Sequence, residues 1–256
     1  MLNYKTQKKL LSIVFFVTFL LAIDTLANQS QSFGNGLISI ADSYKSWFDT
    51  SLIRDIVFTV TRVFIGFVIA SILGILIGLF TGRYVPLLDG LVHILNYLRA
   101  ITPVALAPFF LVMFGISELS KVLLVAWGAF FPVWINAHLA NTALSEEMRA
   151  SAKLQGLSKT RLFRHFYLPA TLGGAYPGAR IAIGISFILV YISETLGADY
   201  GVGYRLKVAY DTLQLDMMTA SLLLLGALGL LSDRLFVYLA TQMAPWLKYE
   251  KNADNR

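Results

Sequence analysis

Residues 56–80 read IVFTVTRVFIGFVIASILGILIGLF, and this stretch decides the fold class. It contains a single charged side chain, Arg62. Its length exceeds the roughly 20 residues that an α-helix needs to cross the hydrocarbon core of a bilayer. The stretch is therefore predicted to be a membrane-spanning helix.

Five other apolar segments resemble this one in composition. Of the 256 residues, 57% are hydrophobic and only 14% are charged, against about 25% charged residues in an average soluble domain. So few charges cannot cover a water-facing surface, and the prediction is an all-α integral membrane protein with six transmembrane helices. The other segments lie near residues 10–27, 88–113, 120–143, 178–198 and 217–241.

The spans divide the chain into parts. Lys8-Lys9 followed by residues 10–23 also resembles a cleavable secretory signal, but a retained helix is favoured because Asp24 stands where a cleavage region would begin. Residues 38–48 can form an amphipathic helix on the membrane surface. In order, the parts are an N-terminal transmembrane helix (1–27), a periplasmic loop (28–55), a five-span core (56–245) with an inner loop (144–176), and a tail (246–256).

The distribution of positive charge orients the bundle, because cytoplasmic loops carry an excess of Lys and Arg. With the N-terminus inside, five of these residues fall on outer segments: Lys45, Arg54, Lys121, Arg205 and Lys207. Twelve fall on inner segments: Lys5, Lys8, Lys9, Arg83, Arg149, Lys153, Lys159, Arg161, Arg164, Lys248, Lys251 and Arg256. Both termini are therefore predicted to be cytoplasmic.

Small residues recur every four positions in the quoted stretch, at Gly66, Ala70, Gly74 and Gly78. This spacing lets a second backbone approach closely, and such packing associates helices in lipid. Glycine is also simply common in membrane helices. The complete ladder favours a helix that is buried against its neighbours.

Two prolines, Pro103 and Pro108, interrupt the segment near residues 88–113. Each removes a backbone hydrogen bond, and the groups left over must be satisfied by a neighbouring helix or a wet cavity. A broken helix of this kind suggests the wall of a translocation pathway. An ordinary packed kink is the other interpretation.

Charged side chains within the spans form a second set of candidates, because burying charge in a membrane is costly. Either Arg62 and Arg99 line an anion pathway, or they pair with Glu194 or another carboxylate. The candidate pathway residues are thus Arg62, Arg99, Pro103, Pro108 and Glu194. Three more charges are expected to reach the cytoplasmic interface by snorkelling: Arg180, Asp233 and Arg234.

No metal or cofactor site is expected in this chain. It has no cysteine, and His93, His138 and His165 lie far apart without metal-ligand spacing. No Gly-x-x-x-x-Gly-Lys-Ser/Thr sequence occurs, so the loop that cradles the phosphates of ATP is lacking. The net charge of +6 is attributed to cytoplasmic loops rather than to nucleic-acid binding.

The inner loop contains ASAKLQGLSKTRLFRHFYLP at residues 150–169. Gly156 suits the left-handed position that ends a first short helix. Ser158 can cap a second, amphipathic helix, which Pro169 is expected to stop. Such a pair on the cytoplasmic face is a natural docking element for a soluble partner. A DNA-binding helix-turn-helix is disfavoured by the neighbouring spans, and a merely solvated basic loop is a further alternative.

This loop resembles the signature of permease subunits of bacterial ABC importers, which reads Glu-Ala-Ala, three residues, Gly, nine residues, then Ile-x-Leu-Pro. Ala152, Gly156, Leu168 and Pro169 match at the required spacing. Three positions depart from the pattern: Ala150 for Glu, Ser151 for Ala and Phe166 for Ile.

Other segments are similar to the nitrate, sulfonate and taurine branch of that family. They are LRAITPVALAP at 98–108, FGISELSK at 114–121, and ETLGA at 194–198 with GVGY at 201–204. The resemblance covers about residues 50–245.

The resemblance implies a type I ABC importer permease fold in the bacterial inner membrane. It implies import of a small solute, such as a sulfonate, taurine or nitrate, by a permease homodimer in contact with membrane lipid. It also implies two ATPase subunits that bind ATP and Mg²⁺, and an extracytoplasmic solute-binding protein, so that the chain itself is not an enzyme. The implied ATPase-coupling residues are Ala150, Ser151, Ala152, Leu154, Gln155, Gly156, Leu157, Leu168 and Pro169.

On composition alone, a secondary transporter driven by an ion gradient is the alternative. Such a protein would normally show inverted repeats and midplane carboxylates, and neither is clear in this sequence. An intramembrane enzyme has less support, because no catalytic cluster occurs at a suitable spacing.

Overall fold

The computed structural model describes Val14, Thr18 and residues 50–144 and 158–243. Every described element is helical. In order, the elements from residue 50 onward are α3 (Thr50–Arg83), α4 (Val85–Ala100), α5 (Pro103–Phe114), α6 (Glu118–Thr142), α8 (Lys159–Leu162), the π-helix η1 (Phe163–Tyr167), α9 (Leu168–Gly197), α10 (Val202–Asp211) and α11 (Leu215–Met243).

Four helical runs are long and apolar enough to cross a membrane: α3, α6, α11, and the run Thr160–Gly197 that joins α8, η1 and α9. The pair α4 and α5 is a fifth candidate, bent by 93° at the break between its helices. These runs correspond to the five spans predicted for the core. The predicted first span and most of both termini lie outside the described residues, so six helices and cytoplasmic termini stay predictions.

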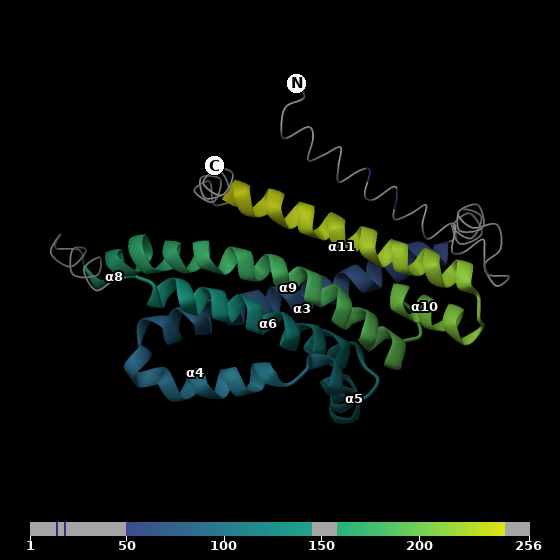
Figure 1. Cartoon of the computed structure of the whole chain (residues 1–256), viewed down its shortest axis with the longest axis horizontal. Coiled ribbons are helices and arrows are strands. Elements are labelled where there is room, and N and C mark those ends of the chain that lie inside the picture. The colour runs from purple at the N-terminus through teal and green to yellow at the C-terminus, as the bar shows by residue number, and fades with distance from the viewer. Residues whose placement is uncertain (1–13, 15–17, 19–49, 145–157, 244–256) are drawn as a thin grey trace, which may run out of the picture.

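Helix α6 lies at the centre of the bundle and packs against α3 and α9 along its length (Figure 1). Helix α11 packs on α9, and α5 packs on α6. Helices α3 and α6 begin, at Thr50 and Glu118, at the end of the bundle where α9 ends at Gly197; this end is called the Thr50 end. The opposite end, where α3 ends at Arg83 and α6 ends at Thr142, is called the Arg83 end (Figure 1). The short helix α10 lies at the Thr50 end, where it contacts α3, α9 and α11.

The small-residue ladder of α3 faces α6, as predicted. A Cβ atom added at Gly66 would lie 2.6 Å from Cγ1 of Val125, and one added at Gly78 would lie 2.5 Å from Cβ of Ala137. Contacts shorter than 3 Å are not tolerated, so each glycine marks a point where the two backbones are as close as they can be. The prediction that this helix is buried against a neighbour is confirmed.

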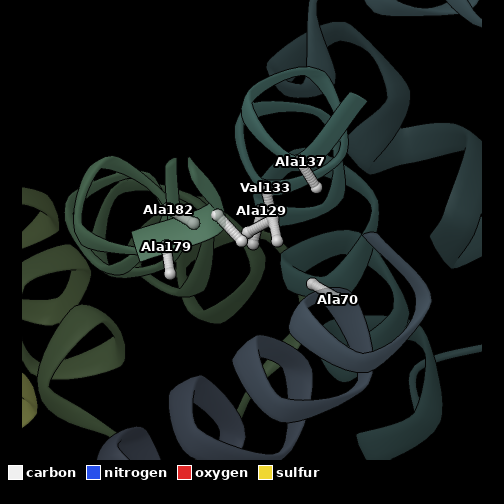
Figure 2. Packing of buried hydrophobic residues seen from close by; sticks show 7 residues of the cluster. Ala70, Ala129, Val133, Ala137, Ala179 and Ala182 are labelled. Carbon is white, nitrogen blue, oxygen red and sulfur yellow. The ribbon is translucent and has the colours of Figure 1, made fainter. Parts of the chain in front are cut away.

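One cluster of buried residues where α3, α6 and α9 meet consists of small side chains (Figure 2). In this cluster the helices pack closely through methyl groups, the mode that stabilises helix pairs in lipid. The cluster contains Ala70, Ala129, Val133, Ala137, Ala175, Ala179 and Ala182.

Replacing Gly78 by valine is expected to separate α3 from α6. Overpacking of a well-filled interior costs about 1–3 kcal/mol, and more where backbone must move. The thermal unfolding midpoint of the purified protein in detergent should therefore fall markedly. Gly90→Val is the matched control, because a Cβ at Gly90 meets nothing within 4 Å. Equal midpoints for the two variants would contradict this packing.

The prediction that Pro169 stops the helix after Gly156 is wrong. The chain is helical from Lys159 to Gly197, and Pro169 lies in the first turn of α9. Directly before it, η1 is a π turn in which the N–H of Leu168 donates to the carbonyl of Phe163. A π turn is wider than an α turn, which relieves the clash between the proline ring and the preceding turn. The second half of the predicted coupling loop is thus a continuous extension of α9.

Candidate functional site

Six charged side chains meet at the Thr50 end, where α3, α6, α9 and α10 come together. Three carboxylates face three cationic groups, and the exposed Arg54 lies 3.9 Å from Asp55 at the edge of the network. Buried charges are tolerated when they are paired and hydrogen-bonded in this way. The members of this network are Asp55, Glu118 and Glu194 with Arg62, Lys121 and Arg205.

Arg62 lies at the centre of the network and is 2% exposed. Its Nε and Nη2 donate to the two carboxylate oxygens of Glu118, at 2.6 and 2.7 Å. Its Nη1 donates to Oε1 of Glu194 at 2.7 Å and to the backbone carbonyl of Tyr200 at 3.0 Å. The ring of Tyr200 lies 5.1 Å from the guanidinium carbon, in the range of a cation–π contact. This one side chain therefore joins three separate segments of the chain.

Glu194 is fully buried, and its carboxylate accepts hydrogen bonds from three directions. Besides Arg62, the hydroxyl of Thr59 donates to it at 2.8 Å and the backbone N–H of Gly203 at 2.8 Å. The Thr59 hydroxyl in turn accepts the N–H of Val202 at 3.0 Å. The start of α10 is thus fixed against α3 and α9.

The glycines of the GVGY segment let the backbone wrap around this carboxylate. Gly201 has a φ of 128°, a region that side chains rarely adopt, and a Cβ there would lie 2.5 Å from Cδ of Glu194. Its N–H donates to Oδ1 of Asp55 at 3.0 Å. Asp55 also pairs with Arg205, whose Nη2 donates to the hydroxyl of Ser51 at 2.8 Å. Gly201 is required here for both conformation and space.

Of the two alternatives for Arg62, the geometry supports pairing with Glu194. Its four hydrogen bonds use most of the five donors of a guanidinium, which leaves little capacity for a solute. The partners Asp55, Glu118 and Arg205 were not expected from sequence, because 56 to 154 residues separate the bonded groups. Two signals pointed to this region: all three residues lie at the ends of apolar segments, and Glu118 and Arg205 lie in or directly after segments similar to the family branch, at 114–121 and 201–204.

A second candidate site lies at the break between α4 and α5. Ile101 and Thr102 are extended, with ψ angles of 120° and 119°, and for Thr102 this is expected because it directly precedes Pro103. Beside the break is a recess of about 360 Å³ between α4, α5, α6 and α9, lined by Arg99, Pro103 and Val104 among others. Pro108 continues α5 and is exposed. The structure thus brings Arg99 and Pro103 together, away from Arg62 and Glu194.

A groove of about 480 Å³ separates α9 from α11. The guanidinium of Arg180 binds both carboxylate oxygens of Asp233 at one end of it, at 2.7 and 3.0 Å. Ile188 lines this groove and also the recess at the α4–α5 break. The two hollows therefore border each other at this residue of α9.

At the Arg83 end, a cation–π cluster joins α3 to η1. The guanidinium carbon of Arg83 lies 4.5 Å from the ring centroid of Tyr167, 5.3 Å from that of Tyr84 and 5.9 Å from that of Phe163. Arg83 therefore ties the end of α3 to the helical second half of the predicted coupling loop. Leu168 and Pro169 begin α9 directly after this cluster. The other predicted coupling residues, in 150–157, lie outside the described residues.

The sequence of this chain is similar to those of known proteins. Residues 74–245 match the model of the family described as binding-protein-dependent transport system inner membrane component. The nitrate import permease protein NrtB of Synechocystis is 29% identical, over 73% of this chain and 68% of the relative. The putative aliphatic sulfonates transport permease protein SsuC of Bacillus subtilis is also 29% identical, over 73% of this chain and 68% of the relative.

The fold is similar to that of a chain of the MetNI methionine ABC transporter solved in inward facing conformations. The two chains are 19% identical and superpose with a TM-score of 0.58, over 77% of this chain and 95% of the other. At this identity the likeness concerns the fold alone.

Proposed function

The chain belongs to the inner membrane components of binding-protein-dependent transport systems, the permease subunits of ABC importers, and from this membership we propose that it imports a small anion driven by a separate ATPase. The observation that carries the proposal is the family match over residues 74–245, which includes the loop with Gly156, Leu168 and Pro169. The four helical runs long and apolar enough to cross a membrane, with the bent pair α4 and α5 as a fifth candidate, agree with it.

The proposed substrate is an inorganic or organic oxyanion. The relatives are named for nitrate and for aliphatic sulfonates, which share a delocalised negative charge over several oxygen atoms. For this chain we infer a solute of the same class, such as nitrate, taurine or another sulfonate. The extracytoplasmic binding protein would do most of the selection among them.

The proposed assembly is a homodimer of this chain in the bacterial inner membrane, with six spans per chain and both termini cytoplasmic. Two ATPase subunits bind ATP and Mg²⁺ on the cytoplasmic face, and a solute-binding protein delivers the anion on the other. The chain itself contains no phosphate-cradling loop, so ATP binding is assigned to the partner subunits. The proposed role of the chain is to supply the passage and the mechanical link.

The link proposed is the segment 150–156, predicted from the sequence to be helical, which would move with the ATPase subunits when ATP closes them. Two features of the described residues support it. The helical run from Lys159 to Gly197 is continuous with a membrane span, and Arg83 joins the start of that run to α3. A displacement of the loop would therefore move two helices of the central bundle together and shift it between inward-open and outward-open packings.

Replacing Gly156 by valine tests this coupling. A β-branched residue is strained in the left-handed conformation that ends a helix, so the turn should be disturbed while the spans stay intact. We expect uptake of the solute by cells to fall at least about tenfold, as a shift of 1.4 kcal/mol in the coupling equilibrium would produce, with normal amounts of the protein in the membrane.

The matched control is Gly173→Val, because a Cβ at Gly173 in α9 meets nothing within 4 Å. It should transport normally. Wild-type uptake by Gly156→Val would contradict the proposed link.

A further inference from the structure

The recess at the α4–α5 break lies near the middle of the spans that surround it. Pro132 is close to the midpoint of α6, and Ile185 is just past the midpoint of α9. Val104 and Pro103, at the start of α5, form the wall opposite these helices. The recess is therefore at membrane depth rather than at a membrane surface.

Backbone hydrogen bonding is interrupted at two places around this recess. At the break itself, the N–H of Ile101 donates to the carbonyl of Leu98 and the N–H of Ala105 donates to the carbonyl of Thr102, but the other carbonyls at the end of α4 have no partner within that helix. On α6, Pro132 has no N–H to donate to the carbonyl of Gly128, and both residues line the recess. Such groups are tolerated at membrane depth only inside protein or beside water. Two interruptions at one recess favour a hydrated hollow.

Arg99 is the only charged side chain among the described residues that line the recess. It is exposed, and no hydrogen bond or ion pair joins its side chain to another described residue. Arg62 and Arg180, in contrast, each bind a carboxylate through two hydrogen bonds. An unpaired guanidinium at membrane depth is costly unless an anion or water compensates it. The planar fork of Arg also matches the oxygen atoms of an oxyanion.

We propose that this recess is an anion-binding station on the translocation pathway, in which Arg99 binds the transported oxyanion. The identity of that anion rests on the proposed function. The apolar remainder of the wall, with Phe131 and Ile188, offers no second polar group to hold the solute. Binding by one guanidinium in a wet hollow is weak enough to release the anion onward, as a pathway requires.

The absence of cysteine from the chain allows a direct test. Val104→Cys places one thiol in the recess, where residue 104 is 45% exposed. Membranes containing the full-length chain are treated with anionic 2-sulfonatoethyl methanethiosulfonate or with its cationic trimethylammonium counterpart. In both reactions the thiolate displaces methanesulfinate and forms a mixed disulfide, so only the charge of the reagent differs. The ratio of the two rate constants measures the local potential.

The proposal predicts that this ratio favours the anionic reagent by about tenfold relative to a thiol at Leu213→Cys, which is 81% exposed in the turn before α11, because a nearby unit charge attracts one reagent and repels the other. Arg99→Gln should abolish the preference and Arg99→Lys should retain most of it. Added nitrate or taurine should slow labelling at Val104→Cys but not at Leu213→Cys.

Three results would overturn the proposal. They are a ratio at Val104→Cys equal to that at Leu213→Cys, a preference that survives in Arg99→Gln, and no reaction at Val104→Cys with either reagent. The comparison of the two cysteines in the presence of the native Arg99 does not depend on how the Arg99 variants fold. Labelling also needs no ATP, so its outcome is independent of whether an ATPase drives the chain.

Discussion

Cells that express Arg62→Gln are expected to contain little folded protein. The substitution leaves the fully buried Glu194 without its cation and removes the two hydrogen bonds to Glu118. Removing one partner of a buried ion pair costs about 3–5 kcal/mol, a large share of the 5–15 kcal/mol that stabilises a typical folded protein. Size-exclusion chromatography of a fluorescent fusion, together with the unfolding midpoint in detergent, measures the effect.

Arg180→Gln is the matched control for this substitution. Its guanidinium also binds a carboxylate through two hydrogen bonds, but the Arg180 side chain is 52% exposed. Exposed pairs contribute about 0–1 kcal/mol, so the folded amount should change little. If Arg62→Gln folds as well as Arg180→Gln and loses only uptake, then Arg62 acts in the pathway and the structural interpretation is wrong.

A double variant separates loss of the pair from loss of packing. Replacing Arg62 and Glu194 together by methionine removes both buried charges, and apolar replacement of a buried pair is often nearly neutral. The double variant should therefore be more stable than either single variant. The double variant should not regain the full stability of the wild type, because Glu118 and Gly203 lose their partners in the network.

The second large effect is expected for Gly201→Ala. The φ and ψ angles of 128° and 160° belong to a region used almost only by glycine, and holding an alanine in this region costs about 1–3 kcal/mol. The new Cβ would also lie 2.5 Å from the carboxylate carbon of Glu194 and would displace it from its donors. The unfolding midpoint should fall, and α10 should detach first, which limited proteolysis near residues 199–214 would detect.

Gly115→Ala isolates the conformational part of this effect. Gly115 has φ and ψ angles of 71° and 179°, in the same region, but a Cβ there meets nothing within 4 Å. The difference between the two variants therefore measures the contact with Glu194. Equal losses of stability in the two variants would show that the position of the Glu194 carboxylate does not depend on the glycines that surround it.

The features that sequence predicts here are those with a local pattern. The ladder from Gly66 to Gly78 repeats every four residues, and the structure packs it against α6. Pro103 predicts a break because its own chemistry restricts the residue before it, and the break is present. Periodicity and proline act through neighbours in the chain, so both can be seen in the sequence.

Other features depend on contacts between distant segments. Arg62 and Glu194 stand out as buried charges, but nothing local indicates that Asp55 and Glu118 join them. Helix α10 was not expected, since its sequence is polar and its start is fixed by Thr59 and Glu194 from other helices. These contacts form only when the bundle is assembled.

Pro169 shows a third case. Proline was expected to end a helix, but the π turn of η1 accommodates it, and the helix continues into the membrane span. Leu162 and Tyr167, at the two ends of this turn, pack against Leu79 of α3. The sequence alone does not reveal that packing.

We propose that a separate ATPase drives this bundle. ATP hydrolysis by the complex that copurifies with the affinity-tagged chain from membranes of its own host tests this proposal. We expect the preparation to contain a second subunit and to hydrolyse ATP. A folded, monodisperse preparation that hydrolyses no ATP, and that takes up solute in vesicles only under an imposed ion gradient, would contradict it.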